Sequence, residues 1–447
     1  MNTDESGENH QIPSLWRLAT PVLIEQTLTM LVGLTDFFLT GRYLQQQHLA
    51  AMGLLQYLLW MLPTLFAAVA IGATAMTARF VGAGDRLAAN RVLHQSLLIG
   101  AVLMAAVTLG LSLGGRHLVR VLQMQGESAD LTVEFLNIVL WSVPLLMVEV
   151  VGVACLRGAG RMGSGLLVMA GVNVVNTVAA LLLMRQWGLG WRGLAMATAC
   201  GHITGGLLVI ALFAVGQGGL RWSLALFRPD RELIHRLLKI GLPGGLDQAG
   251  VMICHFGFVS MINGLGELAT AAHGVALRVE SLCYPPAVAF HYVAATLAGQ
   301  HLGARQPHLA RDSVRKCWLW GTGFMTLAGL VFFVFADPLP RLFVRAEHEP
   351  VSLAASQLLR ILAFSMPGFA TVSILNGGFR GAGDTRWPLA VNFIGLLGIR
   401  LPMVWLLAYA WKFGVDGAWF AVVADLTVRG GLVMLRLRQG GWLEAKV

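Results

Sequence analysis

Asp36 is the residue whose type and surroundings most clearly point to chemistry. It lies in the apolar segment LVGLTDFFLTGR, where helical spacing places Thr29, Gly33 and Thr40 on the same face. A carboxylate in hydrocarbon is costly to keep charged without a partner, and no cation in this segment supplies one. Asp36 could therefore carry a proton or exchange it for a cation. The alternative is a hydrated side chain near the membrane surface, because Arg42 follows closely.

Two amides form a second candidate group. Asn173 and Asn176 in MAGVNVVNTVAAL are three residues apart and share a helical face with Thr177. Amides can coordinate Na⁺ or hydrogen-bond a carboxylate in either protonation state. We predict that Asp36, Asn173 and Asn176 couple an ion, with Asp36 and Asn176 as the ligands if that ion is Na⁺. The alternative is that the amides join helices to one another.

Further ionisable residues at membrane depth are candidates for coupling or gating. Glu25 and Asp247 each lie four residues after a proline, Pro21 and Pro243, that recurs in the two halves of the chain. Because they occupy the same repeat position, we expect a structural or gating role near the cytoplasmic ends of their helices. Glu280 could either couple an ion or anchor neighbouring helices.

Other polar residues of the apolar segments complete the candidate set. His255 is a further candidate for coupling or gating. Asp425 and Arg429, four residues apart on a helix, predict an internal ion pair. The predicted substrate cavity is lined by Thr29, Thr40, Ser373 and Asn376.

The segments that hold these residues are apolar enough to cross a membrane. Hydrophobic residues make up 56% of the chain and charged residues 12%, with a mean hydropathy of +0.68, which excludes an ordinary soluble protein. Apolar runs near the length needed to span a bilayer predict twelve transmembrane helices. They are expected near 14–40, 47–75, 92–114, 131–155, 163–184, 191–214, 238–262, 268–297, 316–336, 351–378, 388–410 and 413–436.

The two halves of the chain repeat each other. Pro243 lies 222 residues after Pro21, and CLRGAG at 155–160 returns as GFRGAG at 378–383. Six spans per half is an even number, so the repeats are parallel. We expect an all-α integral membrane fold with two pseudo-symmetric six-helix lobes around a central cavity. The predicted parts are a polar N-terminal tail 1–12, an N-lobe 13–214, a cytoplasmic linker 215–237, a C-lobe 238–436 and a C-terminal tail 437–447.

Charge and motif content narrow the possible functions. Lys and Arg concentrate in the connections on the side of the N-terminus, which predicts that both termini are cytoplasmic. The net charge of +9 follows from this asymmetry, so we expect the lipid bilayer and not nucleic acid as a partner. The five cysteines form no metal-ligand pattern, and no cofactor, metal or disulfide is predicted. No nucleotide-binding or hydrolase motif is present, so the chain is not expected to be an enzyme.

The motifs and their order resemble the multidrug and toxic compound extrusion (MATE) family. They are P-x-x-x-E-Q followed by VGLTDFFLTGR, the FVGAGD loop, LRGAGR, the segment LAT-x-AHG-x-ALRVES, LAGQHLGAR and FRGAGDTRWP. The resemblance covers about residues 12–436. It implies a monomeric, multi-pass transporter of the bacterial inner membrane with two lobes around a cavity. It also implies export of cationic or amphipathic organic compounds in exchange for H⁺ or Na⁺.

The resemblance also carries over to single residues. Asp36 matches the first-helix carboxylate that family members use for coupling, and Asn176 matches the fifth-helix asparagine of the same pocket. Ala180 stands where DinF-like members often have Asp, whereas Glu280 matches an acid of NorM-like members. The C-lobe acids of other members are replaced, by Val251 after the seventh-helix proline and by the acid-free stretch TVSILNG at 371–377. Coupling is therefore expected to depend on Asp36.

Two other functions compete with this interpretation. A lipid-linked sugar flippase of the same superfamily would need a cavity rich in Arg or Lys, and only Arg278 and Arg400 are expected to lie deep in the membrane. An integral-membrane enzyme would need a paired His/Asp or metal constellation, which the sequence does not offer. Both are the weaker alternatives.

Overall fold

The computed structural model describes residues 15–121, 124–342 and 349–445, and this part of the chain is helical with no strand. The predicted all-α membrane architecture is confirmed. The first half contains α1 Leu15–Tyr43, α2 Gln46–Leu65, α3 Ala67–Gly82, α4 Arg86–Val121, α5 Glu127–Leu140, α6 Val143–Gly158, α7 Met162–Ala180 and α8 Gly190–Ala214. The second half contains α9 Arg231–Asn263, α10 Glu267–Ser281, α11 Tyr284–Gly303, α12 Pro307–Val334, α13 Pro338–Arg341, α14 Glu349–Gly381, α15 Arg386–Phe393, α16 Leu401–Val404 and α17 Gly414–Gln439.

The membrane-crossing segments agree with the predicted pattern. In the described residues, ten helical stretches are long and apolar enough to cross a membrane, and α5 with α6, bent by 64°, makes an eleventh. The segment α10–α11 is the twelfth in the repeat, and His291, Gln300 and His301 lower its hydropathy. Two repeated prolines mark breaks in these segments: Pro63 precedes the end of α2, and Pro285 lies in the first turn of α11.

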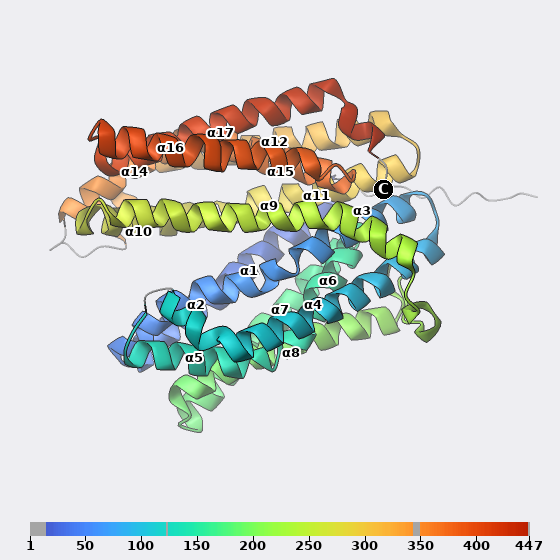
Figure 1. Ribbon diagram of the computed structural model, residues 1–447, viewed down its shortest axis with the longest axis horizontal. Coiled ribbons are helices and arrows are strands. Elements are labelled where there is room, and N and C mark those ends of the chain that lie inside the picture. Colours follow the sequence, from blue (N-terminus) through green and yellow to red (C-terminus); the bar gives the residue numbers. More distant parts are fainter. Residues whose placement is uncertain (1–14, 122–123, 343–348, 446–447) are drawn as a thin grey trace, which may run out of the picture.

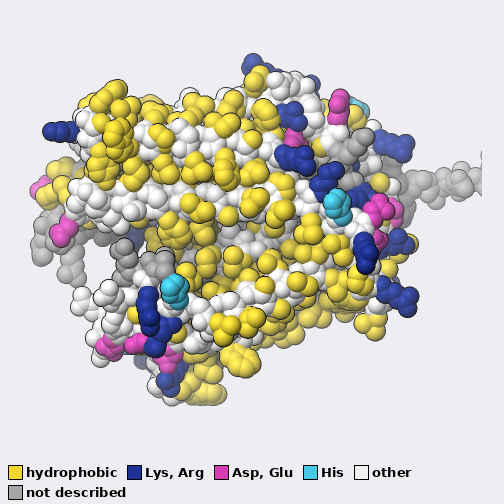
Figure 2. Space-filling view, viewed as in Figure 1, with side chains coloured by type: hydrophobic (Ala, Val, Ile, Leu, Met, Phe, Trp, Pro, Cys, Tyr) yellow, Lys and Arg dark blue, Asp and Glu magenta, His cyan; other side chains and the backbone are white. Residues whose placement is uncertain are grey.

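The helices form two lobes that meet at one end. The N-lobe comprises α1 to α8 and the C-lobe α9 to α17. Figure 1 shows the two lobes on opposite sides, with α3 of the N-lobe beside α9 and α11 where they meet. The lobes approach each other at the end that holds the 215–230 linker, which we call the linker end. They diverge toward the opposite, open end, and Figure 2 shows the surface hollowed between them there. The same view shows an apolar band between two charged ends, as expected for a membrane protein.

A reciprocal crossing of α3 and α11 closes the linker end. A Cβ at Gly82 would lie 2.0 Å from the carbonyl oxygen of Gln300, and a Cβ at Gly303 would lie 2.0 Å from that of Arg79. Both glycines and both carbonyl groups are related by the same 221-residue offset, so the contact is pseudo-symmetric. The repeated glycines therefore let the two helix backbones touch across the lobes.

The linker packs against the N-lobe and is shorter than predicted. Gln95 of α4 donates to the carbonyl oxygens of Leu226 and Arg228, at 3.0 and 2.9 Å, and accepts from the amide of Asp230 at 3.0 Å. The Asp230 side chain then caps α9 by accepting from the Leu233 amide. Residues 231–237, predicted to be linker, are thus the first turns of α9.

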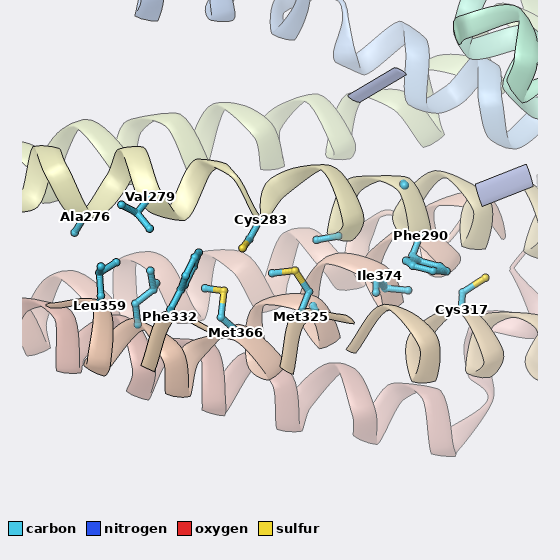
Figure 3. Close-up of a cluster of buried hydrophobic side chains, with 14 of the residues drawn as sticks. Ala276, Val279, Cys283, Phe290, Cys317, Met325, Phe332, Leu359, Met366 and Ile374 are labelled. Carbon is cyan, nitrogen blue, oxygen red and sulfur yellow. The ribbon is translucent and has the colours of Figure 1, made fainter. Parts of the chain in front are cut away.

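Apolar side chains fill each lobe. Figure 3 shows such a cluster in the C-lobe, where Phe290, Met325 and Phe332 pack with Cys283 and Cys317. Cys155 and Cys254 are also buried, and all five cysteines are free. The cysteines are therefore small core residues.

Candidate functional site

Asp36 is buried in the N-lobe without a guanidinium partner. α1 places its side chain at 1% exposure, where the hydroxyl of Thr198 from α8 donates to Oδ2 at 3.2 Å. Its other described neighbours are the amide of Asn176 and the imidazole of His202. Oδ1 of Asp36 has no hydrogen-bond partner. The predicted carboxylate at membrane depth is thus enclosed by protein and incompletely paired.

Asn176 adds two more unpaired polar atoms at the same place. Its side chain on α7 is 1% exposed, and neither its amide nitrogen nor its amide oxygen has a hydrogen-bond partner. Buried polar atoms without partners are rare, because each costs free energy. The oxygens of Asp36, Asn176 and Thr198 are the kind that a hard cation prefers, and the carboxylate can equally hold a proton.

Asn173 is held by the backbone. Its amide nitrogen donates to the carbonyl oxygens of Leu28 on α1 and of Met169 one turn earlier on α7, at 3.0 and 2.9 Å. It therefore joins α7 to α1, which is the role that the alternative interpretation assigned to both amides. The two predicted asparagines have different surroundings although they are one helical turn apart.

Glu149 and His202 are a pair that sequence reasoning missed. Nδ1 of His202 on α8 lies 3.2 Å from Oε2 of Glu149 on α6, and His202 also interacts electrostatically with Asp36. Neither Glu149 nor His202 is among the residues predicted from the sequence. A lone histidine inside an apolar run, GHITGG, was the available signal.

Glu25 pairs with an arginine where the lobes meet. Its carboxylate accepts from Arg157 of α6, and the Arg157 guanidinium lies 4.0 Å from the ring centre of Tyr292 in the C-lobe. Two further bonds cross at this point: Thr296 donates to the carbonyl oxygen of Arg157 at 3.0 Å, and Gln300 donates to that of Gly158 at 2.9 Å. Glu25 therefore lies beside the contact that closes the linker end.

Asp247 makes the corresponding pair in the C-lobe. It accepts from Arg380 of α14 and, at 2.8 Å, from Asn392 of α15. Arg380 is the repeat counterpart of Arg157, so each lobe contains the same acid–arginine pair. Both arginines belong to the repeated RGAG motif, and their side chains turn back into the lobes.

Asp425 lies at the centre of a second C-lobe network. The predicted pair with Arg429 is confirmed, with bonds of 2.6 and 2.5 Å, and Arg400 donates to the same carboxylate at 2.9 Å. Arg429 also donates to Asn392 at 3.1 Å, which connects this network to Asp247.

The expectation that only Arg278 and Arg400 lie deep was wrong. Arg157, Arg380 and Arg429 are largely buried as well, each against a carboxylate. Arg278 is instead exposed, with its guanidinium 5.6 Å from the ring centre of Phe37. Arg157 and Arg380 were missed because each lies in the last turn of its helix, which hid how far the side chain reaches inward.

Glu280 and His255 both lie in the C-lobe. Glu280 is half-buried on α10 and interacts electrostatically with Arg400. His255 is half-buried on α9, with its ring 6.5 Å from that of Tyr57 in the N-lobe. Neither joins the Asp36 group.

The four predicted cavity residues differ in what their polar atoms do. The hydroxyls of Thr29 and Thr40 donate to the carbonyl oxygens of Glu25 and Asp36, and Thr40 is fully buried. The carbonyl oxygen of Ser373 accepts from His291 at 2.8 Å. Asn376 is buried with its amide oxygen unpaired, so it alone of the four retains a buried polar atom without a partner.

Metal-binding clusters are not found in the part of the chain that the structure describes, where no three His, Cys, Asp or Glu side chains gather. The Asp36 group has a single carboxylate beside uncharged oxygens, so its charge matches a proton or a monovalent cation.

Comparisons with known proteins place the chain in a family. The MatE family model matches residues 21–182 and 243–406, which begin at the repeated prolines. The chain is 27% identical to a probable multidrug resistance protein NorM of Thermotoga maritima, over 97% of this chain and 93% of the relative. It is 28% identical to a multidrug resistance protein NorM of Burkholderia vietnamiensis, over 92% and 90% of the two chains.

Solved structures share the fold. A crystal structure of MATE in the straight conformation superimposes with a TM-score of 0.89 at 22% identity, covering 97% of this chain and 96% of the other. The outward-facing conformation of a multidrug resistance MATE family transporter of the MOP superfamily gives 0.88 at 22% identity, with 97% and 96% covered. At this identity the likeness establishes the twelve-helix fold alone.

Proposed function

The chain belongs to the MatE family of membrane transporters, and on that basis we propose that it exports cationic or amphipathic organic compounds in exchange for H⁺ or Na⁺ taken up at Asp36. The observation that carries this proposal is the group of unpaired buried atoms around Asp36: its own Oδ1 and both amide atoms of Asn176. A bound proton or Na⁺ removes the uncompensated charge and can give the unpaired oxygens of Asp36 and Asn176 a partner.

The closed linker end supports an alternating-access cycle. We propose that this end faces the cytoplasm, since Lys and Arg concentrate in its connections, so the described state is open to the outside. Loading Asp36 would change how α1 packs on α7 and α8 and bias the two lobes toward opening inward. An ion shifts the equilibrium between the outward-open and inward-open states only if it binds one state more tightly than the other. In this proposal Asp36 is the group whose affinity for the ion differs between the two states.

Competition at one charge couples the two substrates. With its proton or Na⁺ removed, Asp36 contributes a negative charge that attracts an organic cation toward the N-lobe. Once loaded, it no longer does so. Each substrate therefore weakens the binding of the other by the same factor, which is the linkage that an antiporter needs.

Efflux measured in proteoliposomes with imposed ΔpH and Na⁺ gradients, applied separately, tests the proposal. We expect ethidium export by the wild type under at least one gradient, and we expect Asp36→Asn to abolish it while the protein still folds. Asp130→Asn is a matched control, because this acid lies in an exposed pair with Arg116 at the protein surface. Full gradient-driven export by Asp36→Asn would overturn the assignment.

A further inference from the structure

Glu149 and His202 form a pair inside the N-lobe that takes no part in the proposed exchange at Asp36. Besides the 3.2 Å contact between them, the fold makes room for the carboxylate at Gly205. A Cβ at this position would lie 2.5 Å from Oε2 of Glu149. The glycine and the histidine are three residues apart on α8, so one face of this helix holds the acid.

Among the residues that the structure describes, no arginine forms an ion pair with Glu149 or His202. The charged groups that face it are Asp36 and Glu25, both from α1, and Arg157 of α6 is engaged by Glu25. α7 presents the uncharged amides of Asn173 and Asn176, and α8 adds only the hydroxyl of Thr198 one turn before His202. The charge of Glu149 is therefore balanced only by what His202 carries.

We propose that Glu149 and His202 form a second proton-carrying site beside Asp36, so that the N-lobe exchanges two protons per transport cycle. This inference rests on the proposed function with H⁺ as the coupling ion. It assigns a transported proton to residues outside the Asp36 group and fixes how many charges move in each cycle.

The proton chemistry is that of an imidazole–carboxylate couple. In the unloaded state neutral His202 donates its Nδ1–H to Glu149, and the pair carries one negative charge. A proton from solvent binds at Nε2 and leaves an imidazolium–carboxylate ion pair with no net charge; release reverses this step. The side chain of His202 is 21% exposed and that of Glu149 only 7%, so the imidazole is the member that solvent protons reach.

Two protons make the exchange sensitive to voltage. With Asp36 included, the N-lobe group changes from two negative charges when empty to none when loaded. Exporting one monovalent organic cation for two protons then moves one positive charge inward per cycle. A membrane potential that is negative inside therefore drives export even without ΔpH. With a single proton, the same exchange moves no net charge.

The dependence of export on membrane potential can be measured directly. Proteoliposomes are given a K⁺/valinomycin potential with equal pH on both sides, and ethidium export is recorded after subtracting the signal of protein-free liposomes. We expect wild type and Glu149→Asp to export under the potential and under ΔpH. We expect His202→Asn, which keeps a donor for Glu149, and Glu149→Gln to export under ΔpH alone. Gly205→Ala, which displaces the carboxylate, should behave like Glu149→Gln.

The outcomes separate the two proposals. Potential-driven export by His202→Asn, or a wild type driven by ΔpH but not by the potential, overturns the second proton site and leaves the exchange at Asp36 intact. A wild type that exports under neither a proton nor a Na⁺ gradient overturns the proposed function itself. Retained ΔpH-driven export shows that a variant is folded.

Discussion

At the residue scale, the two asparagines of α7 are expected to have different roles: Asn173 in stability and Asn176 in the proposed ion exchange. Asn176→Ala removes an amide that is unpaired in this state but is placed to hydrogen-bond Asp36 or to coordinate its ion during the cycle. It should reduce gradient-driven export about tenfold or more, since a hydrogen bond to a charged group contributes about 1.5–3 kcal/mol. Asn173→Ala removes bonds to backbone carbonyls and should lower thermal stability while leaving the ion dependence unchanged. Efflux and thermal unfolding of both variants check this, and the reverse pattern contradicts it.

The carboxylate of Asp425 should matter for folding. Asp425→Asn leaves Arg400 and Arg429 buried without their counter-charge, which should destabilise the protein by about 3–5 kcal/mol. Asp337→Asn is the control, because Asp337 pairs with Arg360 at the surface, where such a pair contributes about 0–1 kcal/mol. Thermal unfolding in detergent compares the stabilities of the two variants. An equal loss of stability in both would mean that the C-lobe network does not hold α15 against α17.

Sequence alone could identify single residues better than their partners. Asp36 stood out because a carboxylate in an apolar run is costly wherever the helix packs, and the Asp425–Arg429 pair was visible because its members are one turn apart. Glu25 and Arg157 are 132 residues apart, so only the packing of α1 on α6 reveals that they pair. His202 was missed for the same reason, since its candidate role depends on its contact with Glu149 of another helix.

At the element scale, the crossing of α3 and α11 determines which end is closed. Gly303→Ala places a methyl group against the Arg79 carbonyl, where a Cβ would be 2.0 Å away, and should shift the protein toward states that are open at the linker end. Spin labels at Leu87 and Gln306 should then report longer distances between the lobes. Gly274→Ala is the control, since no atom lies within 4 Å of its added carbon. Unchanged distances in Gly303→Ala would show that this contact does not hold the lobes together.

The repeated glycines also show what a sequence repeat cannot reveal. Gly82 lies in FVGAGD and Gly303 in LAGQHLGAR, and the glycines of such segments are typical of turns between helices. The positive φ of 77° belongs to Gly84, two residues on, whereas Gly82 ends α3 and contacts the other lobe. The turn could be predicted from local sequence, and the contact could not, because it joins residues more than two hundred positions apart.

At the scale of the whole molecule, two lobes of one ancestry differ in charge balance. The N-lobe group contains more acids than arginines: Glu25, Asp36 and Glu149 against Arg157. The C-lobe group is balanced: Asp247, Glu280 and Asp425 against Arg380, Arg400 and Arg429. On the proposed function, this imbalance means that a proton or cation is needed in the N-lobe alone, while the C-lobe acts as a matching rigid body.

This imbalance predicts that the coupling carboxylate cannot be moved to the other lobe. Phe258 is the repeat counterpart of Asp36, and its ring centre lies 6.0 Å from the Arg400 guanidinium. In a D36N/F258D double variant the new carboxylate would pair with Arg400, and a paired acid has no need of a transported cation. Efflux by the double variant should therefore be as low as that of Asp36→Asn, with F258D alone as the control for folding. Restored gradient-driven export would mean that position within the repeat, and not the charge balance of the lobe, decides where the ion is exchanged.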